Sequence, residues 1–111
     1  PAGPPRRLVV LGFSQGVATA VRWVVRSRHA VDRVIAWAGS LPAELEPSAA
    51  APLSGRLTMV AGRADELLTP ERIESEHARL QSLGVDAPLV WYDGGHALDA
   101  STLARVAGGG S

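Results

Sequence analysis

The segment Gly12-Phe13-Ser14-Gln15-Gly16 has the clearest capacity for chemistry in this sequence. It follows a short apolar run at residues 8–11 and precedes apolar residues at helical spacing. A G-x-S-x-G sequence between a strand and a helix is typical of a nucleophilic serine, because the sharp turn lifts the hydroxyl above the sheet. We expect strained backbone angles at Ser14. We also expect that side chains at positions 12 and 16 would collide with the neighbouring backbone, which would explain both glycines.

The N–H of Gln15 would lie near a helix N-terminus, where it can stabilise the charge that develops on a substrate carbonyl. The pentapeptide is short, however, and a simpler interpretation is available. Gly12 would then only end a strand, and Ser14 would only cap the helix that follows.

A nucleophilic serine needs a general base, and the base needs a carboxylate that orients it. Three histidines are available. His29 lies in a polar connector and is interpreted as a surface residue, and His77 lies on the apolar stripe of a helix and is interpreted as a packing residue. His96 follows a strand within a Gly-Gly loop, which lets the ring swing over the edge of the sheet. His96 is therefore the predicted base, the alternative being a histidine that only occupies a tight turn.

The predicted acid is Asp65, which follows Gly62 at the end of a strand. Glu66 occupies the same loop, but the shorter side chain of Asp65 suits a fixed contact better, and Glu66 is expected to face solvent or the next helix. Asp93 and Asp99 flank His96 and are interpreted as turn and helix-cap residues.

These residues require a framework of alternating strands and helices. Apolar runs bounded by glycine predict buried strands, and apolar residues at helical spacing predict helices. Strands are expected at residues 8–11, 33–38, 57–61 and 88–92, and helices at residues 16–26, 70–83 and 100–107, with a loop containing one short helical turn at residues 41–54. This order predicts an α/β fold with a parallel sheet of about four strands, whose ligands bind beyond the carboxyl ends of the strands. Trp23, Trp37 and Trp91 are interpreted as core residues.

Composition narrows the function further. The chain has 111 residues, of which 46% are hydrophobic and 20% charged, as in one packed domain. Eleven basic residues balance eleven acidic ones, which argues against nucleic acid or anionic lipid as a partner. The apolar stretches are too short for a membrane span. The absence of cysteine excludes disulfides and thiolate metal sites. The histidines share no ligand spacing, so neither a metal nor a cofactor is expected.

Four motifs, in order, resemble the carboxylesterase/phospholipase family of α/β-hydrolases, which includes acyl-protein thioesterases. They are Gly12-Phe13-Ser14-Gln15-Gly16, Trp37-Ala38-Gly39-Ser40-Leu41-Pro42, Gly62-Arg63-Ala64-Asp65 and Gly94-Gly95-His96. Carried over to these positions, the resemblance implies Ser14 as nucleophile, Asp65 as acid, His96 as base and the Gln15 N–H as one oxyanion donor. It also implies an ester or thioester substrate. Val17 stands where the family has a second glycine.

The resemblance extends over residues 8–107, and it matches the last four of the family's eight strands. We therefore expect the C-terminal half of an α/β-hydrolase domain at residues 1–107, with a flexible glycine-rich tail or linker at residues 108–111. The loop that supplies the other oxyanion donor in the family has no counterpart, so little activity is expected from the chain alone. The alternative hypothesis is a non-catalytic α/β module that binds a partner, or a second copy, through an open sheet edge. No targeting segment is visible, which predicts a cytoplasmic location.

Overall fold

A computed structural model of the chain describes residues 7–27 and 30–108. Strands and helices alternate along the chain, as the sequence pattern predicted. The strands are β1 (Val9–Phe13), β2 (Arg33–Trp37), β3 (Leu57–Gly62) and β4 (Leu89–Tyr92). The α-helices are α1 (Gly16–Arg26), α2 (Pro47–Ala50), α3 (Pro70–Ser82) and α4 (Ala100–Ala107), and a 3-10 turn, η1 (Ala51–Leu53), follows α2.

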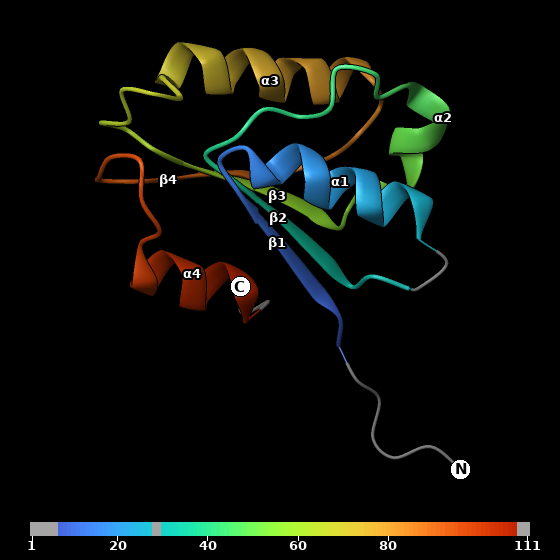
Figure 1. The fold of residues 1–111 in the computed structure, drawn as a ribbon, viewed down its shortest axis with the longest axis horizontal. Helices are drawn as coiled ribbons and strands as arrows, with labels where there is room; N and C mark the ends of the chain where they lie inside the picture. Colours follow the sequence, from blue (N-terminus) through green and yellow to red (C-terminus); the bar gives the residue numbers. More distant parts are fainter. Residues whose placement is uncertain (1–6, 28–29, 109–111) are drawn as a thin grey trace.

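The four strands form one parallel sheet in the order β1-β2-β3-β4 (Figure 1). Phe13 pairs with Trp37, Trp37 with Val60, and Gly62 with Tyr92, so the carboxyl ends of all four strands lie along the same edge. The two central strands are almost wholly buried, whereas β1 and β4 are mostly half-buried. Central strands covered on both faces are typical of parallel sheets. The predicted α/β fold is confirmed.

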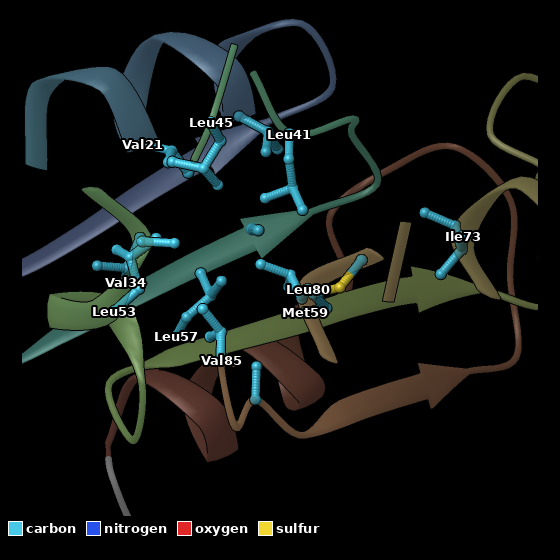
Figure 2. Packing of buried hydrophobic residues seen from close by; sticks show 14 of the residues in the cluster. Val21, Val34, Leu41, Leu45, Leu53, Leu57, Met59, Ile73, Leu80 and Val85 are labelled. Carbon is cyan, nitrogen blue, oxygen red and sulfur yellow. The ribbon is translucent and has the colours of Figure 1, made fainter. Parts of the chain in front are cut away.

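Helices cover both faces of this sheet and form two separate hydrophobic clusters. On one face α1, η1 and α3 pack against β2 and β3, and Figure 2 shows this cluster from close by. On the other face α4 is the one helix among the described residues that packs on the sheet (Figure 1). Its Val106 belongs to the same buried cluster as Ile35 and Trp37. Full burial of one large apolar side chain in these clusters stabilises the folded state by about 1.5–3 kcal/mol. The two-sided core holds the strand ends, and the loops that follow them, in a fixed arrangement.

Two helices begin at side chains that cap them. The Thr69 hydroxyl accepts a hydrogen bond from the backbone N–H of Arg72 at the start of α3, and Pro70 occupies the first helical position, as predicted. The Asp99 carboxylate accepts from the N–H of Thr102 at 3.0 Å and starts α4. This finding agrees with the interpretation of Asp99 as a cap residue.

One expectation about the core is wrong. Trp37 is fully buried and Trp91 is half-buried, but Trp23 is 46% exposed. Helix α1 turns Val17 and Val21 toward the sheet, and a residue two positions beyond Val21 lies off that buried stripe.

Two of the predictions concern residues that the structure does not describe. His29 and residues 109–111 of the predicted tail lie outside the described residues. Among the residues that are described, no helix is both long enough and apolar enough to cross a membrane.

Candidate active site

Ser14 occupies the turn between β1 and α1 and has a strained backbone. Its φ angle is +56°, in the left-handed region that residues with a β-carbon rarely adopt. The Ser14 N–H donates to the carbonyl of Trp37 at 2.8 Å, which ties the turn to the end of β2. Gln15 is the N-cap residue of α1, so its N–H lies at the positive end of the helix. The expected strain at the serine is confirmed.

The glycines around this turn do not all have the predicted role. A Cβ atom at Gly12 would lie 2.6 Å from the carbonyl oxygen of Gly16, so the steric requirement at position 12 is confirmed. At Gly16 a Cβ atom would meet nothing within 4 Å, and the steric explanation is wrong there. The Cα–Cβ direction at position 16 points into open space.

The close approach lies instead at Gly39, where a Cβ atom would be 2.1 Å from the Ser14 carbonyl oxygen and 2.4 Å from Val17 Cγ2. Val17 is fully buried. The missing side chain at position 39 therefore leaves the space that the Val17 side chain occupies.

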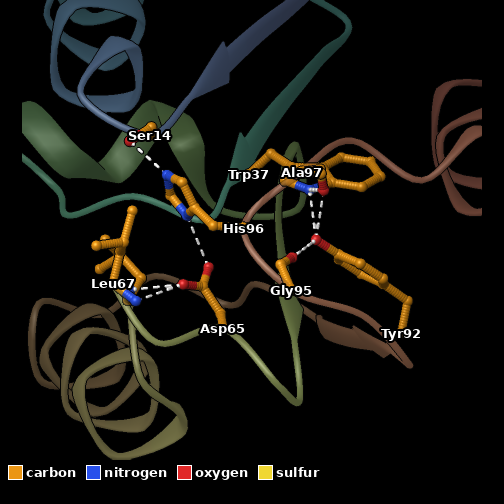
Figure 3. A network of polar contacts seen from close by, with 9 residues as sticks. Ser14, Trp37, Asp65, Leu67, Tyr92, Gly95, His96 and Ala97 are labelled. Carbon is orange, nitrogen blue, oxygen red and sulfur yellow. Dashed lines mark hydrogen bonds and ion pairs between the residues drawn. The ribbon is translucent and has the colours of Figure 1, made fainter.

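The structure brings Ser14, His96 and Asp65 together at the carboxyl edge of the sheet (Figure 3). The distance from His96 Nε2 to Ser14 Oγ is 2.9 Å, and that from His96 Nδ1 to Asp65 Oδ2 is 2.8 Å. An ionised carboxylate can only accept, so Nδ1 carries the proton and Nε2 is free to accept from the serine hydroxyl. The hydroxyl proton of Ser14 can thus pass to His96 Nε2, while Asp65 holds the ring through Nδ1–H.

Asp65 is only 2% exposed and has a full set of partners. Its Oδ1 atom accepts from the backbone N–H groups of Leu67 at 2.8 Å and Leu68 at 2.9 Å. Burial alone would raise the pKa of this carboxyl, but the hydrogen bonds from His96, Leu68 and Leu67 outweigh burial and hold the pKa below its ordinary value. Glu66 is exposed. Of the two acidic residues in this loop, only Asp65 contacts the histidine.

The loops that carry Asp65 and His96 are packed against each other. The Ala64 N–H donates to the Gly94 carbonyl at 2.9 Å. A Cβ atom at Gly62 would lie 2.3 Å from that same carbonyl oxygen, so the two loops can approach this closely only because residue 62 is glycine. The Phe13 ring lies 5.0 Å from the His96 ring, centre to centre, and packs against its side.

A pocket of about 270 Å³ lies beside Ser14. Gln15 and Arg22 supply polar atoms to its lining, and Ala18, Leu41, Pro42 and Leu68 supply apolar atoms.

One wall of this pocket is the loop after β2, residues 39–43, which α3 holds through three charged side chains. Buried Glu76 accepts from the Leu41 N–H at 2.7 Å, Arg79 donates to the Pro42 carbonyl at 2.6 Å, and Arg72 donates to the Ser40 hydroxyl at 3.1 Å. Sequence analysis missed these contacts, although the three residues lie at helical spacing on one face of α3.

The remaining candidate residues lie elsewhere. His77 Nε2 is 2.7 Å from the Ala87 carbonyl oxygen and is half-buried, in agreement with a packing role. Asp93 is exposed and forms an ion pair with Arg63 at 3.7 Å. Within residues 7–27 and 30–108, no three His, Asp or Glu side chains are grouped closely enough to hold a metal ion.

The arrangement was compared with known proteins. No protein-family model matches the chain, and no curated protein matches its sequence. Solved structures do match. The structure of esterase PE8 superimposes with a TM-score of 0.68 at 25% identity, covering 90% of this chain and 47% of that protein. The chain has an α/β-hydrolase-like fold.

Two further structures with this α/β-hydrolase-like fold match at lower identity. Acyl-protein thioesterase 2 from Zea mays gives a TM-score of 0.72 at 21% identity, covering 95% of this chain and 55% of that protein. A Bacillus cereus carboxylesterase gives a TM-score of 0.67 at 19% identity, with coverage of 88% and 46%. The chain spans about half the length of the structures it matches.

Proposed function

We propose that this chain carries the reacting groups of a serine hydrolase that cleaves carboxylic esters or thioesters. The observation that carries the proposal is the pair of contacts that His96 makes, one with the Ser14 hydroxyl and one with the buried carboxylate of Asp65. A serine hydroxyl held next to an oriented imidazole is the arrangement that activates serine toward acyl carbon atoms. The names of the structural neighbours, which include an esterase, a thioesterase and a carboxylesterase, support a hydrolase function.

In the proposed reaction, Ser14 Oγ attacks the carbonyl carbon of the substrate while His96 Nε2 takes the hydroxyl proton. Asp65 accepts from His96 Nδ1–H and stabilises the imidazolium that results. The negative charge that develops on the carbonyl oxygen is stabilised by the Gln15 N–H at the N-terminal end of α1. The C–O or C–S bond then breaks, and His96 returns the proton to the leaving alcohol or thiol.

The second half of the reaction releases the acid. Water attacks the acyl group on Ser14 Oγ, and His96 Nε2 takes a proton from this water. The bond to Ser14 Oγ breaks, the carboxylic acid leaves, and the proton returns to the serine hydroxyl. The whole cycle consumes one water molecule and leaves the protein unchanged.

The surroundings of Ser14 support an apolar acyl group as the part of the substrate that the site binds. The pocket beside Ser14 has an apolar wall that includes Leu41 and Leu68. Two leucines of the same edge are exposed, Leu67 by 72% and Leu98 by 47%, and each lies two residues from Asp65 or His96 in sequence. Exposed leucines around a polar centre favour an apolar ligand.

The proposal is tested with a fluorophosphonate probe, which forms a bond only with an activated serine. The chain is labelled alone and, if it belongs to a longer natural polypeptide, within that polypeptide, and the modified peptide is located by mass spectrometry. We expect labelling of Ser14, loss of labelling in Ser14→Ala, and undiminished labelling in Ser48→Ala, which removes an exposed hydroxyl from α2. A folded protein that does not label in either form would contradict the proposal.

A second candidate function rests on exposed apolar side chains of β1 and α1. Leu11 on the edge strand β1 is 40% exposed, and Trp23 on α1 is 46% exposed. Exposed apolar side chains on an edge strand and on the helix that follows it favour association with another chain. Sedimentation at increasing concentration separates the two functions, because a binding module would self-associate or bind a partner without labelling at Ser14.

A further inference from the structure

The turn that carries His96 is small. The Ala97 N–H donates to the Gly95 carbonyl at 2.9 Å, which closes a three-residue turn with His96 at its centre. One hydrogen bond around a single residue leaves the flanking peptide groups free to rotate. Asp65 and Phe13 contact the ring itself, and the backbone that carries the ring depends on what holds the Gly95 and Ala97 carbonyls.

A single side chain contacts both of these carbonyls. The hydroxyl oxygen of Tyr92 lies 2.6 Å from the Gly95 carbonyl oxygen and 2.5 Å from that of Ala97 (Figure 3). A phenolic hydroxyl has one proton, so it shares this proton between the two acceptors. Tyr92 is the last residue of β4 and is 8% exposed, which places its hydroxyl among buried groups where water competes little.

A second side chain reaches the same point from another strand. Trp37, the last residue of β2, is fully buried, and its Nε1–H donates to the Ala97 carbonyl at 3.1 Å. The same nitrogen lies 3.4 Å from the Tyr92 hydroxyl, and the two rings pack at 5.4 Å between centres. Two strands of the core thus supply donors to the backbone on both sides of the histidine.

We infer that Tyr92 and Trp37 are positioning residues for His96, acting through the two carbonyls that flank it. This inference rests on the proposed function, because it concerns the base of that reaction. The Gly95 carbonyl belongs to the peptide group that precedes His96, and the Ala97 carbonyl belongs to the peptide group that follows Ala97. Fixing both restricts the backbone on the two sides of His96, and so it aims the ring at Ser14. A displacement of about 1 Å at a reacting group can lower a rate by about a hundredfold, so small gains in rigidity here affect the rate strongly.

The test compares Tyr92→Phe with the wild-type protein. This substitution removes the hydroxyl and keeps the ring against Trp37. We expect the maximal rate constant for fluorophosphonate labelling of Ser14 (kinact) to fall by about tenfold to a hundredfold. The probe concentration that gives half this rate (KI) should not change, because the pocket that binds the probe is untouched. The matched control is Thr58→Val, which removes a hydroxyl from a residue of the neighbouring strand that is 7% exposed, and it should label at the wild-type rate.

A second measurement follows individual protons of this network by NMR, first in the wild-type protein and then in the variant. The Trp37 indole N–H should exchange with deuterated solvent much more slowly than a free indole, because it is buried and donates to Ala97. In Tyr92→Phe, the NMR signal of the proton on His96 Nδ1 should broaden as the ring becomes mobile, while circular dichroism remains that of a folded protein.

The possible failures are distinguishable. A wild-type protein that does not label at Ser14 would overturn the proposed function and this inference with it. A labelled wild type with an equally reactive Tyr92→Phe variant, or rapid exchange of the Trp37 indole proton, would overturn only the inference.

Discussion

The alpha carbon of Gly39 lies so close to Ser14 that a Cβ atom at position 39 would come within 2.1 Å of the Ser14 carbonyl oxygen. The loop after β2 therefore packs directly on the turn that carries the serine, with no space for any side chain at this contact. Val17, which fills the rest of the space, is fully buried and cannot move aside without disturbing the core.

This contact predicts opposite outcomes for two glycine substitutions. Gly39→Ala should lower the free energy of unfolding by about 1–3 kcal/mol, because backbone and Val17 must shift to accept the methyl group. Gly16→Ala should leave stability unchanged or raise it by about 0.5–1 kcal/mol, because position 16 has open space and lies in the first turn of α1. Urea unfolding of the two variants measures both values. Equal destabilisation would contradict this account of the turn.

The positive φ of Ser14 predicts that glycine is preferred to alanine at this position. Ser14→Gly should exceed Ser14→Ala in free energy of unfolding by about 1 kcal/mol, because both lose the hydrogen bond to His96 and only glycine adopts this conformation without strain. At the control position Ser101, in the first turn of α4, glycine should have the opposite effect relative to alanine, because glycine weakens a helix. Thermal and urea unfolding give the sign of each change. A Ser14→Gly variant no more stable than Ser14→Ala would mean that the turn is not strained.

The depressed pKa of Asp65 predicts how stability responds to acid. Because the folded-state pKa lies below the unfolded value, the carboxylate contributes stability above the unfolded pKa, and this contribution is lost as the pH falls through the folded pKa. We expect the stability difference between wild type and Asp65→Asn to be largest near neutral pH and to shrink in acid. Urea unfolding at a series of pH values measures this difference. Asp93→Asn is the control, since its exposed carboxylate pairs only at 3.7 Å and should change the curve little.

The contact between Glu76 and Leu41 predicts a change in the wall of the pocket. Glu76→Ala leaves the buried Leu41 N–H without an acceptor and should cost about 1–3 kcal/mol. Hydrogen exchange followed by mass spectrometry should then show faster exchange in residues 39–43 than in the wild type. Glu76→Gln keeps an acceptor oxygen and should restore most of the protection. If the alanine variant exchanged at the wild-type rate, Glu76 would not hold this loop.

Much of the fold and of the candidate site could be predicted because the relevant signals are local. Strands appear as short apolar runs with a glycine within two residues of their end, and Ser14, Asp65 and His96 each lie within a few residues of such an end. Trp37 could be predicted as a core residue, but its contact with Ala97 could not, because the two are 60 residues apart and meet only once β2 and β4 take their places.

Glycines show the same limit. Gly16 belongs to the motif, yet the direction of its Cα–Cβ bond depends on how α1 leaves the sheet. Gly39 bears on the serine turn only because β2 pairs with β1. Steric roles of this kind depend on neighbours across the sheet, which the order of residues along the chain does not reveal.

The contacts of His96 also determine when Ser14 can become reactive. Ser14 and His96 are 82 residues apart, and Asp65 and His96 are 31 apart. During synthesis Ser14 leaves the ribosome long before His96. Until β4 joins the sheet, His96 contacts neither the Ser14 hydroxyl nor the Asp65 carboxylate. A chain that loses β4 by local unfolding returns to that condition. The labelling rate of Ser14 would therefore report the fraction of molecules whose sheet is complete.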